Sequence, residues 1–317
     1  MEPGKTRVRK TPAHYPMSLK YTEHKNAENF LAKARAALER QECVHGLMLG
    51  ICLRLVSEPN AYGSQPYLAT VESASGLRVA AVMTPPYKLQ IYSEDDRETT
   101  GLGLVADALW QGKWPVPGVM AREATAEAFA SIWCPMAGAN SRTGMRQGIY
   151  ELRQVIHPKY PSGEFRQADL EDLELVRRWA SGFHDDIFSK EQLEQTVKAG
   201  EEAAKNGKLF LWVGNEPKSM AARTRPTPHG EAITFVYTPP SQRRKGYATA
   251  VVAQLSQRIL DDGRQFCTLY TDLSNSTSNS IYQRIGYKKI TDVVDIHFQG
   301  MTNDSKTTMN KSKENIE

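Results

Sequence analysis

The sequence predicts an α/β protein built from two halves. Amphipathic helical segments alternate with short apolar strands along most of the chain. A length of 317 residues is large enough for two cores of ordinary size. Near the middle, the stretch 157–163 (HPKYPSG) contains two prolines and a glycine that interrupt the periodicity. The order of helices and strands is similar on the two sides of this break, which favours a duplicated fold.

The first half alternates helical and strand patterns. The apolar window Val44–Val56 is too short to cross a bilayer and contains His45 and Arg54, so we interpret it as core. The expected elements of this half are a helix at 26–41, strands at 67–73, 77–83 and 89–93, a helix at 103–110, a strand at 116–120, a helix at 123–133 and a strand at 147–155.

The second half restarts after the central break with a similar series. Its expected elements are a strand at 164–168, helices at 170–183 and 190–207, strands at 209–215, 218–223 and 231–238, a helix from Tyr247 to about Gly263, a strand at 265–272, a short helix at 277–286 and a strand at 287–298. The resulting organisation is a basic arm at 1–20, domains at 21–157 and 160–298, and a disordered tail at 299–317.

Composition excludes several classes of protein. A net charge of +4 over this length does not predict a nucleic-acid or membrane surface, and no aromatic residues are interleaved with the basic run Arg243–Lys245. The four cysteines form no CxxC pair, so we expect no metal and a reducing compartment. The amino-terminal residues have no apolar stretch typical of a secretory signal. These observations predict a cytoplasmic protein, and they leave its oligomeric state open.

One turn in the second half indicates a ligand. Arg243, Arg244, Lys245 and Gly246 lie between a buried strand and the helix that begins at Tyr247. The amino terminus of a helix presents unpaired N–H groups and the positive end of its dipole, which suits an anion. Gly246 permits close approach of the backbone to that anion. A solvated basic turn that only caps the helix is the alternative.

The sequence RRKGYA (243–248) resembles the Arg/Gln-x-x-Gly-x-Gly/Ala signature of the GNAT superfamily of N-acetyltransferases, with Ala248 at the last position. About thirty residues later, NSTSNSIYQRIGY (275–287) is similar to the second motif of that superfamily. The resemblance covers roughly residues 160–298. It looks especially like a bacterial branch of predicted acetyltransferases with a GNAT-like amino-terminal half.

This resemblance implies a GNAT fold, in which helices cover both faces of a mixed central sheet, and a tandem of a degenerate first domain and an intact second domain. The first half shows no counterpart of the glycine turn, because the stretch after Val82–Pro86 continues as a strand. Acetyl-CoA is the implied cosubstrate. Its pyrophosphate would lie on the backbone amides of residues 244–249 and its pantetheine arm beside the strand 233–238, where one N–H would polarise the thioester carbonyl. The implied cofactor-binding residues are Val236, Tyr237, Thr238, Arg243, Arg244, Lys245, Gly246, Tyr247, Ala248, Thr249, Asn275, Ser278 and Tyr282.

Two residues are the candidate catalytic side chains. Tyr282 falls on the family's tyrosine and is expected to protonate or hydrogen-bond the departing thiolate, with packing under the sheet as the alternative. Asn275 is expected to bind pantetheine, to cap its helix, or both. Glu231 is the candidate general base, and His229, Asp272 or a water relay are the alternatives.

The predicted function is acetyl-CoA-dependent transfer of an acetyl group to a primary amine. The alternative is a non-catalytic acyl-CoA-binding or regulatory module. The sequence does not identify the acceptor, although Asp185 and Asp186 could attract a cation or could be a solvated helix end. No nucleic acid, membrane or metal is expected as a partner.

Overall fold

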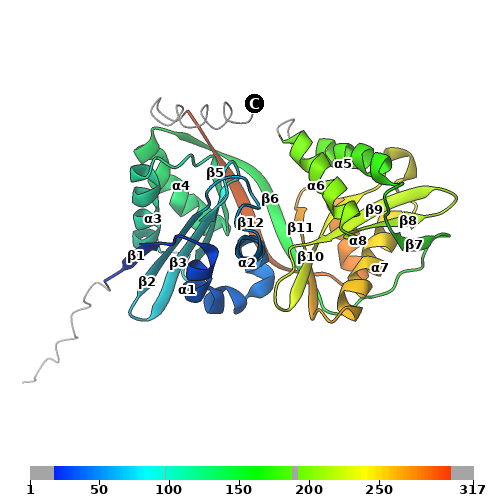
Figure 1. Cartoon of the computed structure of the whole chain (residues 1–317), viewed down its shortest axis with the longest axis horizontal. Helices are drawn as coiled ribbons and strands as arrows, with labels where there is room; N and C mark the ends of the chain where they lie inside the picture. Colours follow the sequence, from blue (N-terminus) through cyan, green and yellow to red (C-terminus); the bar gives the residue numbers. More distant parts are fainter. Residues whose placement is uncertain (1–17, 97, 188–191, 301–317) are drawn as a thin grey trace, which may run out of the picture.

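The computed structural model describes residues 18–96, 98–187 and 192–300. In these residues the chain forms one mixed sheet of twelve strands, and helices cover both of its faces (Figure 1). The predicted α/β class is confirmed.

The elements of the first half follow the predicted order, with a strand (β1) and a helix (α2) that the sequence analysis did not predict. They are β1 (Lys20–Glu23), α1 (Ala27–Glu39), α2 (Glu42–Ser57), β2 (Tyr67–Ser73), β3 (Gly76–Met83), β4 (Leu89–Ser93), α3 (Thr99–Gln111), β5 (Gly118–Ala121), α4 (Glu123–Ala137) and β6 (Asn140–Leu152).

The second half contains the remaining elements. They are β7 (Glu164–Gln167), α5 (Leu173–Ile187), α6 (Leu193–Lys205), β8 (Leu209–Val213), β9 (Pro217–Thr224), β10 (Gly230–Tyr237), a short 3-10 helix (Pro240–Gln242), α7 (Tyr247–Asp261), β11 (Phe266–Asp272), α8 (Ser276–Ile285) and β12 (Lys288–Gln299).

The two halves exchange their last strands at the centre of the sheet. The strand order is β1-β2-β3-β4-β5-β12-β6-β11-β10-β9-β8-β7. Strand β12 of the second half lies between β5 and β6 of the first half, and β6 pairs on its other edge with β11 of the second half. All three pairings are antiparallel. Separation of the two halves would therefore break the backbone hydrogen bonds of β12 with β5 and β6, and those of β6 with β11.

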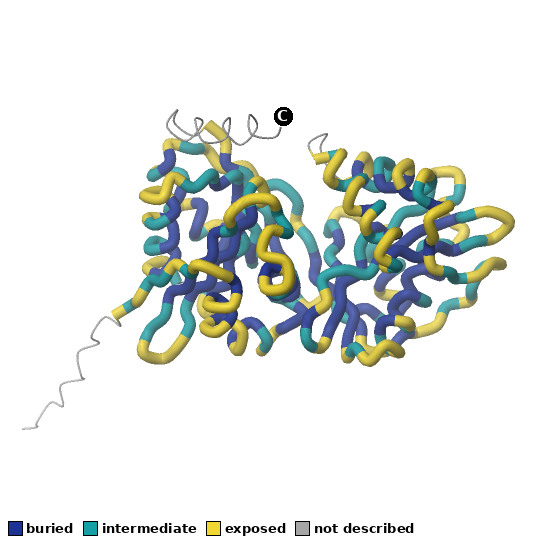
Figure 2. The backbone as a smooth tube through the Cα atoms, viewed as in Figure 1, coloured by how far each residue is buried: buried dark blue, intermediate teal, exposed yellow. Residues whose placement is uncertain are grey.

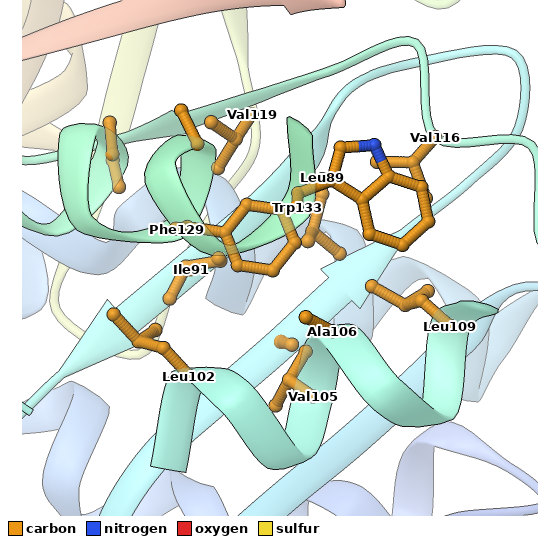
Figure 3. Close-up of a cluster of buried hydrophobic side chains, with 14 of the residues drawn as sticks. Leu89, Ile91, Leu102, Val105, Ala106, Leu109, Val116, Val119, Phe129 and Trp133 are labelled. Carbon is orange, nitrogen blue, oxygen red and sulfur yellow. The ribbon is translucent and has the colours of Figure 1, made fainter. Parts of the chain in front are cut away.

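Alternating side chains along the strands build a separate core on each face of the sheet. In the first half Leu68, Ala80 and Val82 face α1 and α2, whereas Tyr67 and Ala69 face α3 and α4. Figure 3 shows the second of these cores, in which side chains of α3 approach Phe129 and Trp133 of α4. The second half repeats this division, with α5 and α6 on one face and α7 and α8 on the other.

Helix α2 packs against both halves of the molecule. It lies in the middle of Figure 1, nine of its residues between Glu42 and Leu55 are buried, and Figure 2 shows buried segments where the two halves meet. Cys43 contacts Thr268 of β11 with 3.3 Å between Sγ and Oγ1. A Cβ on Gly50 would lie 2.9 Å from the Cβ of Arg225, which follows β9. The interpretation of Val44–Val56 as core is confirmed.

Several predicted boundaries differ from the structure, and those of β1 and β6 change the sheet. Strand β1 begins at Lys20, inside the predicted arm, and β6 begins at Asn140 instead of residue 147. Residues 140–146 are mostly polar and exposed, so they carry no apolar signal. They form a strand because β12 pairs with them from Arg146 to Asn140. Apart from residues 18–20, 299 and 300, the predicted arm and tail lie outside the described residues, and the division at 157–160 stays a prediction.

The exchanged strands predict that the two halves unfold together. Trp133 is 1% exposed in the core between α3 and α4, whereas its neighbour Trp110 is 38% exposed. Replacing Trp133 by Ala should lower the free energy of unfolding by about 3–5 kcal/mol, and Trp110→Ala should cost much less. Urea unfolding followed by circular dichroism should show one transition that moves as a whole. Two transitions, of which only one moves, would contradict the shared sheet.

Candidate functional site

The parallel strands β10 and β11 form a fork. They pair at only three positions, Gly230 with Phe266, Glu231 with Cys267 and Ala232 with Thr268. Beyond these positions β10 continues to Tyr237 and β11 to Asp272 without pairing to each other. The facing backbone groups of residues 233–237 and 269–272 thus have no partner strand across the gap, which suits an extended ligand that hydrogen-bonds like a strand.

A β-bulge in β10 opens the fork. The register of β10 against β9 shifts between Thr234 and Tyr237, and Phe235 within this bulge has a φ of 53°. A left-handed conformation in a bulky residue is strained and turns the following backbone groups away from the regular ladder. The hydroxyl of Ser219 on β9 fixes the end of the strand, because its Oγ lies 2.9 Å from the carbonyl oxygen of Tyr237 and 2.8 Å from Oγ1 of Thr238.

The turn after β10 forms a concave row of backbone amides. Arg244 has a φ of 63° and Gly246, the N-cap of α7, a φ of 84°. Left-handed residues alternating with ordinary ones point successive N–H groups to one side, and the first N–H groups of α7 join them. A Cβ on Gly246 would meet only Pro161, at 3.9 Å. The space in front of this glycine is therefore open, and the amides can hold an anion such as a pyrophosphate.

The basic side chains mainly hold the turn itself. Arg243 donates from Nε to the carbonyl oxygen of Thr238 at 2.9 Å and forms an ion pair with Asp186 of α5 at 2.5 Å. Lys245 donates to the carbonyl oxygen of Ser241 at 3.0 Å. Both cations are thus already engaged by oxygen atoms of the protein. Asp186 neutralises Arg243, which makes this carboxylate part of the turn and leaves it less able to attract a separate cation.

Tyr282 lies in the core between α7 and α8. It is 7% exposed, and its ring packs edge-on against Tyr287 at a centroid distance of 6.0 Å. Burial raises the pKa of the Tyr282 phenol well above its usual range. The phenol therefore stays protonated at neutral pH and can donate a proton or a hydrogen bond.

Asn275 caps α8. Its side chain accepts a hydrogen bond from the backbone N–H of Ser278 at 3.0 Å, as expected for an N-cap. The sequence analysis missed Asn279, which donates to the carbonyl oxygens of Asp272 and Leu273 and so ties α8 to the end of β11. Its Oδ1 is buried without a hydrogen-bond partner among the described residues. The only sequence signal for it is a second Asn in the motif.

The candidate bases are engaged elsewhere. Glu231 is 4% exposed at the first pairs of β10 and forms a two-pronged ion pair with Arg223, at 2.6 and 3.0 Å. His229 contacts Glu42 of α2 through Nδ1 at 2.7 Å. Asp272, at the open end of the fork, accepts from the backbone N–H of Ser274. These contacts give Glu231 a structural role at the closed end of the fork, and its assignment as the base stays a prediction.

The first half contains a corresponding fork that is closed. Strands β4 and β5 pair at only two positions, but Arg122 reaches across and donates to the carbonyl oxygen of Ser93 at 2.9 Å. The amino terminus of α3 is already capped by the carboxylate of Glu98, which accepts from the N–H of Gly101 at 2.9 Å. The connecting loop also contains Glu94, Asp95 and Asp96. This acidic, capped terminus does not suit a pyrophosphate.

Two cavities of the described residues lie away from the turn Arg243–Gly246. A cavity of 40 Å³ remains in the closed fork, lined by His45, Gln90 and Arg122 among others. A more open groove of 560 Å³ lies where the halves meet, lined by residues that include Arg40, Arg153 and Ile290. None of the predicted cofactor-binding residues lines either of them. In this part of the chain no three His, Cys, Asp or Glu side chains are arranged to hold a metal ion, and no helix is long and apolar enough to cross a membrane.

Comparison with known proteins identifies the fold. The family model described as FR47-like protein matches residues 212–295, which include β10, α7, β11 and α8. None of the curated proteins matches the chain. Solved structures similar to the chain include two proteins described as GNAT-family enzymes and one as a tandem GNAT protein.

A GCN5-related N-acetyltransferase from Sphaerobacter thermophilus superposes with a TM-score of 0.59 and 15% identity, over 88% of this chain and 95% of that one. A GNAT-family acetyltransferase from Colwellia psychrerythraea gives 0.54 and 11%, over 88% and 100%. A tandem GNAT protein from the clavulanic acid biosynthesis pathway gives 0.52 and 11%, over 89% and 98%. The chain therefore has the fold of tandem GNAT proteins, and its residues 212–295 match the FR47-like family model.

Proposed function

We propose that the chain transfers an acetyl group from acetyl-CoA to a primary amine. The observation that carries this proposal is the combination of an open β10–β11 fork with a concave row of amides at the amino terminus of α7. An extended arm and a pyrophosphate are the two recognition elements of coenzyme A, and the second half offers one site for each. Bound acetyl-CoA supplies an acyl group activated as a thioester.

The residues of the chain would act mainly through the backbone. Amides from Arg244 to Thr249 would hold the pyrophosphate, with Tyr247 and Ala248 in the first turn of α7. The backbone of Val236 and Thr238, beyond the bulge, would hydrogen-bond the pantetheine arm and polarise the thioester carbonyl. Asn275 and Ser278 lie at the start of α8, next to the open end of β11.

In the reaction a C–N bond forms to the amine, the C–S bond breaks, the departing thiolate of coenzyme A takes up a proton and the amine nitrogen loses one. Tyr282 would supply the proton or hydrogen bond to the sulfur, since its phenol stays protonated. The ion pair of Glu231 with Arg223 and the contact of His229 with Glu42 favour a water relay as the acceptor of the amine proton. If no base operates, the chain is instead an acyl-CoA-binding module.

The first prediction separates backbone geometry from side-chain charge. Gly246→Val places a β-branched residue at a φ of 84° and fills the open space before the turn. Acetyl-CoA binding, measured by isothermal titration, should fall by roughly 100-fold or more, because several amides lose their alignment. Lys245→Ala, the matched control, should weaken binding only about tenfold or less. Equal losses in the two variants would show that charge, and not backbone geometry, holds the ligand.

The second prediction concerns the acid. Tyr282→Phe should lower kcat by about 10²–10⁴-fold, because one proton donor is removed, while the dissociation constant for acetyl-CoA stays within about threefold. Thiol release from acetyl-CoA measures turnover, and titration measures binding. Tyr287→Phe, which removes a hydroxyl bonded to Ser256 in the same core, is the control for packing. Full activity of Tyr282→Phe across the pH range would assign Tyr282 to packing alone.

The proposed function itself is tested with unmodified protein and a panel of amines, amino acids and peptides. Release of coenzyme A thiol together with an acetylated product, identified by mass spectrometry, is the expected result. Tight binding of acetyl-CoA without thiol release from any amine would favour the non-catalytic module.

A further inference from the structure

Arg225 is a half-buried cation surrounded by aromatic rings and the α2 helix. It follows β9 with a φ of 46°, and its side chain lies beneath α2, close to Gly50. Among the described residues it forms no ion pair within 4.0 Å, and its contacts are with aromatic rings. Burial lowers the pKa of its guanidinium, so the charged form is poorly solvated. An unpaired cation in such surroundings is costly unless a ligand compensates it.

The guanidinium of Arg225 lies beside the fork. Its Cζ is 5.9 Å from the ring centroid of Tyr270. Tyr270 stands on β11 two residues beyond Thr268, the last residue paired with β10. Because side chains alternate along a strand, Tyr270 and Thr268 face the same side of the sheet, which is the α2 side. Arg225 therefore lies near the open part of the fork, on the face opposite to α7 and α8.

Other side chains with hydrogen-bond donors lie near the guanidinium of Arg225. Tyr62, in the loop after α2, is close enough to both Arg54 and Arg225 for their charges to act on its pKa. Arg54 lies over the ring of Tyr62 at 5.6 Å, and its own contact with Glu58 is long, at 3.3 Å. Arg225, Tyr270 and Tyr62 are half-buried and Arg54 is exposed, so solvent reaches the cluster. The hydroxyl of Tyr270 already donates to the carbonyl oxygen of Val44, and Arg54 is paired with Glu58, so the guanidinium of Arg225, with the phenol of Tyr62 nearby, is the group available to an anion.

We infer that the acceptor amine carries a carboxylate or phosphate group, and that Arg225 binds this group on the α2 side of the fork. This inference rests on the proposed function, because it places the acceptor opposite the helix whose amides would hold coenzyme A. The first half thereby contributes to the acceptor site through Tyr62 of the α2 region. A purely structural tie of α2 to Tyr270 is the competing explanation, and it predicts no preference among amines.

Pairs of amines that differ only in the anionic group test the inference. Suitable pairs are tyrosine with tyramine, tryptophan with tryptamine, histidine with histamine, and glucosamine 6-phosphate with glucosamine. In at least one pair the anionic member should have a kcat/KM about 10- to 100-fold higher, the effect of one charge-assisted hydrogen-bonded pair. The carboxylate pairs and the phosphate pair show which of the two anions is bound.

The variant Arg225→Gln should bring that ratio close to one, and Arg264→Gln should leave it unchanged. Arg264 is a suitable control because it is a partly buried arginine of the same half that donates to the carbonyl oxygen of Thr227. Thermal unfolding of both variants shows whether either change acts through stability. Equal slowing of both members of each pair by Arg225→Gln, or an equal preference in unmodified protein, would overturn the inference.

A binding measurement keeps this test separate from the proposed catalysis. N-acetyltyrosine and N-acetyltyramine can be titrated into the protein saturated with coenzyme A, and the other pairs can be treated in the same way. Tighter binding of an anionic member, lost in Arg225→Gln, supports the inference even where no amine releases thiol. Failure of every anionic member to bind more tightly than its uncharged partner would overturn it.

Discussion

The fork between β10 and β11 depends on what holds the outer edge of each strand. Two parallel strands that separate after three residue pairs would pair further or lose their strand conformation if their outer edges were also unpaired. Strand β10 is paired along its other edge with β9, and β11 with six successive residues of β6. Strand β6 belongs to the first half and is itself held by β12. The open fork of the second half is thus maintained by a strand that the first half supplies.

The two halves share a fold but differ in the charge and capping of the helix that follows the fork. At the amino terminus of α7 the turn has two left-handed residues, an open glycine and cations, whereas at the amino terminus of α3 the carboxylate of Glu98 occupies the position that an anionic ligand would need. Arg122 also bridges the parted strands of the first half. The first half therefore has a structural role, because it supplies β6 and places α2 against one face of the second half.

The sequence predicted most elements in their order and the turn before α7, because these depend on local periodicity, glycine and proline, but it did not predict β1 or α2. The exchange of β6 and β12 could not be predicted, since pairing between distant strands leaves no local pattern and residues 140–146 are polar. The bulge at Phe235 could not be predicted from the sequence either, because a phenylalanine in an apolar run does not indicate a positive φ. Glu231 pairs with Arg223 across the β9–β10 hairpin, and His229 contacts Glu42 of the first half, so the engagement of both residues appears only in the fold.

Hydrogen exchange of the backbone amides, measured with and without acetyl-CoA, tests the central claim most directly. If the backbone of the second half forms the cradle, amides from Arg244 to Thr249 and from Val236 to Thr238 should exchange more slowly with the ligand bound, and those at the amino terminus of α3 should not change. Unchanged exchange across residues 236–249 at saturating ligand, or protection confined to the first half, would contradict the account.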